Sequence, residues 1–207
     1  MEKRIRYLLL FVSLTVIAFL QSAVSLYAQE EIIPDAIAEK ISGVPVFLYC
    51  KPVSPYKVLG KAEQRMEILQ MDIEGYTSVR KKAELMVTSA KDRVKTGLLD
   101  NFDAILVDTE SSKTYAITFT SENSLKAKAQ QVRNISVFFF SKPVNEYDVI
   151  AKLPARFPKY DENGLLQDKV KSMINRALRK VKSGDISKFD GVIFNPDDLS
   201  ATIIKFK

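Results

Sequence analysis

Two aspartates stand at equivalent places in two similar stretches of the chain. Asp103 follows a Phe in "FDAILVD", and Asp190 follows a Phe in "FDGVIFN". A pair of carboxylates can perform general acid and base chemistry, provided that the two groups lie within several ångströms of each other. The other interpretation is that each Asp accepts hydrogen bonds from backbone amides in the turn before a strand, which is an ordinary role for this side chain. The pattern favours this structural role, with a carboxylate-dependent hydrolase as the alternative.

Two proline turns carry the same pair of lysine and tyrosine. Lys51 and Tyr56 flank the first turn, and Lys142 and Tyr147 flank the second. A ring that stacks and an ammonium that pairs could together recognise a sugar or an acidic group, so these four residues are the predicted ligand-binding residues. The alternative is structural, because proline sets the dihedral angles of such a turn and a tyrosine covers the edge of a sheet.

The chain has no histidine and a single cysteine, Cys50. The absence of histidine excludes Ser-His-Asp catalysis, Cys-His catalysis and histidine metal ligands. Cys50 cannot form an intramolecular disulfide, and it lies in an apolar run with Ser141 as its counterpart, so we predict a buried core residue rather than a nucleophile.

Asp197 and Asp198 offer oxygen ligands but lack the spacing of a calcium loop. We predict no metal, no cofactor and no enzymatic activity.

Basic residues are concentrated in two segments whose patterns predict amphipathic helices. We expect these residues to form faces directed away from the core, and a ligand bound there would be anionic. The predicted partners are an anionic envelope polymer, lipid headgroups or another envelope protein, whereas the net charge of +6 is too small to indicate nucleic-acid binding. The basic residues are Arg80, Lys81, Lys82, Lys91, Arg93 and Lys95 in the first segment and Lys169, Lys171, Arg176, Arg179, Lys180 and Lys182 in the second.

Two long segments of the sequence resemble two later ones. "VFLYCKPVSPYKVLGK" (46–61) matches "VFFFSKPVNEYDVIAK" (137–152) at eight positions, and residues 86–119 match residues 173–206 at nine. The offsets are 91 and 87 residues, so the first copy has an insertion of four residues, which a surface connection tolerates. We interpret this as an internal repeat of domain size.

Each copy predicts the same order of elements. Apolar runs at 44–50 and 135–141 are typical of buried strands, and second strands follow from Tyr56 and Tyr147. Apolar residues then recur every three or four positions, which predicts a helix that ends before Gly97 in one copy and Gly184 in the other. Two more strands close each copy.

The predicted fold class is therefore α+β, with two tandem ββαββ units, each a mostly antiparallel sheet with one amphipathic helix on one face. The predicted boundaries are a signal peptide at 1–28, a first repeat at 29–120, a linker at 121–134 that could contain a helical turn, and a second repeat at 135–207. The segment "EEIIPDAIAEKIS" before the first apolar run is expected to be irregular or briefly helical.

The N-terminus has the pattern of an export signal. Lys3, Arg4 and Arg6 precede an apolar run from Tyr7 to Leu20, which is short for a membrane span. We predict cleavage after Ala28, with cleavage after Ser25 or a retained anchor as the alternatives. The mature chain would have no transmembrane span and would be periplasmic or extracellular.

A set of matching positions in both copies carries a resemblance to a known family. These are Tyr56, Val58, Leu59, Gly60, Lys61, Gly97, Asp103, Ala104 and Ile105 in the first copy and Tyr147, Val149, Ile150, Ala151, Lys152, Gly184, Asp190, Gly191 and Val192 in the second. The pattern resembles the small α+β domains of the YbjQ-like proteins and of the Rcs envelope-stress lipoprotein. That lipoprotein relies on a lipid-attached cysteine and disulfides, and the family members labelled as heavy-metal binders imply a set of soft ligands. This chain has neither, so only the fold is implied.

Taken together, these features predict an exported, non-enzymatic binding or structural module of the cell envelope. The alternative function is a carboxylate-dependent hydrolase that acts on an envelope polymer through Asp103 and Asp190.

Overall fold

The computed structural model describes residues 33–62, 79–111, 113–122, 124–154, 166–195, 197 and 200–207. The predicted signal peptide at 1–28 lies outside the described residues, and so does Asp198. Residues 33–207 belong to one continuous unit rather than to two separate ones.

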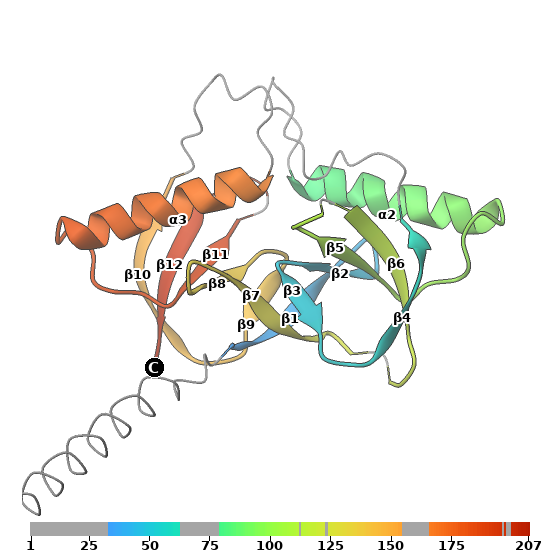
Figure 1. Ribbon diagram of the computed structural model, residues 1–207, viewed down its shortest axis with the longest axis horizontal. Helices are drawn as coiled ribbons and strands as arrows, with labels where there is room; N and C mark the ends of the chain where they lie inside the picture. The colour runs from blue at the N-terminus through green and yellow to red at the C-terminus, as the bar shows by residue number, and fades with distance from the viewer. Residues whose placement is uncertain are drawn as a thin grey trace, which may run out of the picture. The chain divides into compact units, whose positions relative to one another are not determined.

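The chain uses the same order of elements twice (Figure 1). The first half contains β1 (Asp35–Ile41), β2 (Val44–Leu48), β3 (Cys50–Pro52), β4 (Tyr56–Lys61), α2 (Val79–Lys95), β5 (Ala104–Asp108) and β6 (Lys113–Phe119). The second half contains β7 (Lys126–Val132), β8 (Ile135–Phe138), β9 (Ser141–Pro143), β10 (Tyr147–Leu153), α3 (Leu166–Lys182), β11 (Gly191–Phe194) and β12 (Ala201–Phe206).

All of these strands belong to one 12-stranded sheet with the order β10-β12-β11-β8-β7-β1-β2-β5-β6-β4, to which β3 is added on β7 and β9 on β1. The pairs β2–β5 and β8–β11 are parallel and the other strand pairs are antiparallel. The order therefore reads the same from both ends, with β1 and β7 paired at the centre.

The predicted fold class of two tandem ββαββ units is wrong, because a single mixed sheet runs through both halves. The prediction placed proline turns where the short strands β3 and β9 lie, and it missed two longer strands, β1 in the segment expected to be irregular and β7 in the expected linker. Both strands begin with two alanines at alternate positions, with exposed residues around them, as in "DAIAEKI" and "KAKAQQV". Alanine has a weak strand preference, so this alternation did not stand out as a β pattern.

The central strands exchange partners between the halves. β3 follows β2 of the first half but pairs with β7, whereas β9 follows β8 and pairs with β1. A bridge between Leu48 and Phe139 joins the two crossing segments. These pairings close a small ring of strands. Its small buried residues pack in one hydrophobic cluster with larger side chains such as Phe47, Phe119 and Phe138. The small residues buried on this side of the strands are Ala36, Ala38, Ala127, Ala129, Cys50 and Ser141.

One buried aromatic residue in each half lies at the turn where the chain crosses from its own half to pair with the other half. Tyr49, between β2 and β3, and Phe140, between β8 and β9, have positive φ angles of 56° and 49°, which cost about 1–3 kcal/mol in a bulky residue. The Tyr49 carbonyl accepts a hydrogen bond from the Gln130 amide at 2.8 Å, and the Phe140 carbonyl accepts one from the Glu39 amide at 2.7 Å. Because both side chains are buried, packing holds the two strained turns in place.

The two predicted helices are confirmed, and both pack their apolar stripe on the same hydrophobic core. Each ends at a glycine in the left-handed region, Gly97 with φ 73° and Gly184 with φ 79°. The expected basic outer faces need one correction. Lys82 and Lys169, at equivalent positions in the two helices, are buried and do not belong to the solvent-exposed faces.

Candidate functional site

A cationic surface lies on the exposed side of the central strands β3, β7, β1 and β9. We call it the central lysine face and define it by Lys51, Lys126, Lys128 and Lys142. Pairing between the strands aligns these lysines in two adjacent rows across the strands. At one end of each row, a backbone hydrogen bond places a valine beside the last paired residue. The rows are Lys51–Lys128–Asp35–Val144 and Val53–Lys126–Ile37–Lys142.

The alternation of side chains along each strand produces this face. In the first part of β1 and of β7 every second residue is a buried alanine, so the residues between these alanines point outward. Lys51 comes from β3 and Lys142 from β9, which are the outer strands of the central group. The exchange of these two strands therefore brings lysines from equivalent turns of both halves onto one surface.

The charges on this face are only partly compensated. Lys128 forms an ion pair with Asp35 at 2.8 Å, and Lys51 stands directly opposite Lys128. Hydrogen bonds from Ser111 are the main reason why the pKa of the nearby Asp108 is lowered, and the charge of Lys51 adds to this effect. Like charges in directly opposite positions destabilise a sheet, so this arrangement is not explained by stability.

The structure separates the two predicted tyrosines from the lysines. Tyr56 begins β4 and Tyr147 begins β10, and these strands are the opposite ends of the sheet. Tyr56 is half-buried against the cluster that contains Phe119, which supports its structural interpretation. Sequence reasoning found Lys51 and Lys142 but missed Lys126 and Lys128, because it placed them in a linker. The lysines that alternate with alanine in "KAKA" are the signal that could have identified them.

Asp103 and Asp190 each bind the backbone of a neighbouring strand. The Asp103 carboxylate accepts hydrogen bonds from the Phe119 amide at 2.8 Å and the Thr118 hydroxyl at 2.7 Å, and Asp190 accepts one from the Phe206 amide at 3.0 Å. Four strands lie between β5, which follows Asp103, and β11, which follows Asp190. The arrangement supports the capping role of both residues and offers no shared cleft for acid and base chemistry.

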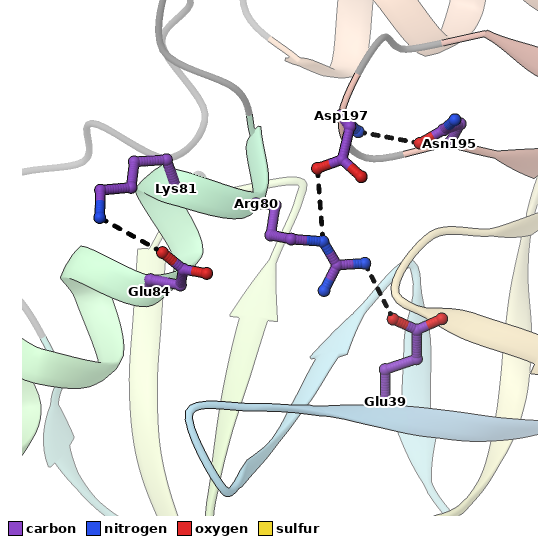
Figure 2. A network of polar contacts seen from close by, with 6 residues as sticks. All are labelled: Glu39, Arg80, Lys81, Glu84, Asn195 and Asp197. Carbon is purple, nitrogen blue, oxygen red and sulfur yellow. Dashed lines mark hydrogen bonds and ion pairs between the residues drawn. The ribbon is translucent and has the colours of Figure 1, made fainter.

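Arg80 joins α2 to both halves of the sheet (Figure 2). Its guanidinium lies 3.4 Å from Glu39 of β1 and 3.4 Å from Asp197, and 5.6 Å above the ring of Phe140. Asp197, considered above as a calcium ligand, is therefore part of an ion pair. In the described part of the chain no group of three or more acidic or cysteine side chains could hold a metal ion. We interpret the group around Arg80 as a structural link between α2 and the sheet. Its ion pairs are partly exposed, and such pairs contribute about 0.2–1 kcal/mol each to the stability of the fold.

Cys50 is buried, as predicted, with 1% of its surface exposed. Burial raises the pKa of the thiol to about 12, and the neighbouring Ser141 hydroxyl only partly offsets this rise. At pH 8 about one thiol in ten thousand would be ionised. We therefore expect Ellman's reagent to leave Cys50 unmodified at pH 8 in the folded protein and to react fully after denaturation. Rapid labelling without denaturant would contradict the buried, neutral thiol.

No protein-family model, curated protein or solved structure matches this chain. The resemblance to YbjQ-like domains thus stays a prediction. Neither of the described helices has the length and apolar character needed to cross a bilayer.

Proposed function

We propose that the chain is an exported, non-enzymatic binding module of the cell envelope that docks on anionic lipid headgroups through the central lysine face. The observation that supports this proposal is the pair of lysine rows built by strand exchange. The face also exposes aliphatic side chains next to the lysines, namely Ile37, Val53 and Val144. Cations interspersed with exposed aliphatic groups are suited to a membrane surface, where phosphates and the upper acyl chains lie close together.

The expected affinity is modest. Each lysine near an anionic membrane surface contributes about 1 kcal/mol, and Asp35 offsets one of the four lysines. The face therefore contributes about 3 kcal/mol, which corresponds to a dissociation constant of about 6 mM. The exposed aliphatic groups would strengthen this binding. The module would therefore associate reversibly and would respond to the charge of the membrane.

Export is the second part of the proposal. It rests on Lys3, Arg4 and Arg6 and on the apolar run that follows them. Sequencing the N-terminus of the native protein tests this part, with Gln29 as the expected first residue.

Sedimentation with lipid vesicles tests the lysine face. We expect the protein to pellet with phosphatidylglycerol vesicles and not with pure phosphatidylcholine vesicles, and to be released near 1 M salt, where the Debye length falls to about 3 Å. The double variant Lys51→Glu/Lys142→Glu should lose at least tenfold in affinity, because it reverses two of the four charges. Lys57→Glu/Lys171→Glu is the matched control, since it makes the same change in net charge at exposed positions outside the face.

The two variants separate a specific face from a general charge effect. Equal losses in both variants would mean that net charge alone causes binding and would contradict the proposal. Binding to a dissolved acidic polysaccharide without binding to vesicles would replace lipid by polymer as the partner.

A further inference from the structure

A groove lies along the C-terminal half of α3, on a part of the molecule that shares no residue with the central lysine face. Its volume is about 680 Å³, and we call it the α3 groove. Leu178, Val181 and Phe189 provide its apolar lining. Pockets of about 300–1,000 Å³ that combine apolar walls with a few polar groups are typical of small-molecule sites.

Four cations surround this apolar lining, and they come from three separate places in the chain. Arg133 lies in the turn between β7 and β8, Arg179 and Lys182 lie on α3, and Lys188 lies in the segment before β11. None of these four side chains forms an ion pair within the described residues. Asp190 is the single carboxylate of the lining, and it already accepts a hydrogen bond from the Phe206 amide. The groove therefore carries an excess of positive charge.

Asn175 gives the groove a further polar group. It belongs to the lining, and its side-chain oxygen is buried without a hydrogen-bond partner among the described residues. Buried polar atoms without a partner are rare in native proteins. This unsatisfied acceptor is therefore a feature of the groove wall that stability does not explain.

The equivalent place in the first half carries different groups. Lys91 of α2 corresponds to Leu178, and its ammonium donates a hydrogen bond to the carbonyl of Ser42 at 2.8 Å, so it reaches from the helix to the β1–β2 turn. Asp92 corresponds to Arg179 and pairs with Lys95 at 2.9 Å. The same helix and turn thus fold in the first half with charges that largely pair with one another, which indicates that the fold does not require the cations of the α3 groove.

We infer that the α3 groove binds a small amphipathic anion, in which a phosphate, sulfate or carboxylate head is joined to an acyl or aromatic body. The head would pair with Arg133, Arg179, Lys182 and Lys188, and guanidinium groups bind such oxyanions with two hydrogen bonds at once. The body would cover Leu178, Val181 and Phe189. This site is independent of the function proposed for the central lysine face, so either proposal can fail without the other.

Calorimetric titration of the full chain with decyl phosphate, below its critical micelle concentration, tests the inference. The comparison ligands are inorganic phosphate, which lacks the apolar body, and decyl maltoside, which lacks the charge. We expect one molecule of decyl phosphate to bind at least tenfold more tightly than either comparison ligand, because only decyl phosphate uses both the cations and the apolar lining. Equal binding of inorganic phosphate would overturn the requirement for an apolar body, and no binding of decyl phosphate would overturn the site.

Two substitutions that copy the first half locate the site. Leu178→Lys should place a long side chain across the groove, as Lys91 reaches the β1–β2 turn in the first half, and should weaken binding at least tenfold, although it adds a positive charge. Arg179→Asp copies Asp92 and should weaken binding by a similar factor. The matched controls are Leu85→Lys on α2 and Lys171→Asp on the exposed side of α3, and both should bind within twofold of the unmodified protein.

Circular dichroism establishes whether each variant is folded. Leu178→Lys changes the apolar lining and Arg179→Asp changes the charge, so the test still holds if one of the two variants fails to fold. Binding that survives both groove substitutions but is lost in Lys51→Glu/Lys142→Glu would place decyl phosphate on the central lysine face and would overturn the α3 groove.

Discussion

Residues 33–122, produced without the second half, should not form a stable monomer. In the whole chain β1 pairs with β7 and β9, and β3 pairs with β7, so removal of the second half leaves the central edges of the first half without partners. It also uncovers Ala36, Ala38 and Cys50, which are buried in the ring of strands. Unpaired edges beside an uncovered apolar surface cause either unfolding or association.

Association would follow the symmetry of the sheet. Since both halves have equivalent elements in the same order, a second copy of residues 33–122 can offer its own β1 and β3 where the whole chain offers β7 and β9. We therefore expect an unfolded chain at low concentration and an exchanged dimer at high concentration. Light scattering and circular dichroism over a range of concentrations measure both states.

Production of residues 33–122 together with residues 124–207 is the control. The two fragments should form a one-to-one complex with the far-ultraviolet spectrum of the whole chain, because together they restore all of the strand pairs. A first half that stays monomeric and melts cooperatively near the temperature of the whole protein would contradict the exchanged sheet.

The sequence predicted those elements whose signal is local. Val79, Ala83, Met86 and Ala90 recur with helical spacing, and the same spacing in the second half predicted α3. The strands β2 and β8 were evident because their side chains are apolar and buried on both faces. These patterns depend only on neighbours along the chain, so they can be read without knowledge of the partner.

The partner of each strand could not be predicted in this way. β3 and β9 are nearly identical in sequence, and the strands β7 and β1 with which they pair share two buried alanines at equivalent positions, so pairing within a half and pairing between the halves satisfy the same hydrophobic pattern. The choice is made by the positive φ angles of Tyr49 and Phe140, which are unusual for aromatic residues. The candidate sites depend on this choice. Lys51 and Lys142 share a face only because β3 and β9 cross to the other half.

Phe139→Ala should lower the free energy of unfolding by about 3–5 kcal/mol, the usual cost of truncating a fully buried phenylalanine. The ring of Phe139 lies 5.5 Å from the ring of Phe194, 5.2 Å from that of Phe140 and 6.3 Å from that of Tyr49. Its backbone forms the bridge to Leu48 at the crossing of the two halves. The substitution would therefore leave a cavity where side chains from both halves meet.

Denaturant unfolding measures this change, and Leu98→Ala serves as the control because Leu98 is 67% exposed and should change stability by less than about 0.5 kcal/mol. A loss of 3–5 kcal/mol is a large part of the 5–15 kcal/mol that stabilise a typical domain. Since Phe139 contacts Tyr49 of the first half as well as Phe140 and Phe194 of the second, the variant should still unfold in a single transition, shifted to lower denaturant. Two separate transitions, with one half unaffected by the substitution, would show that the halves are stabilised independently and would contradict a shared core.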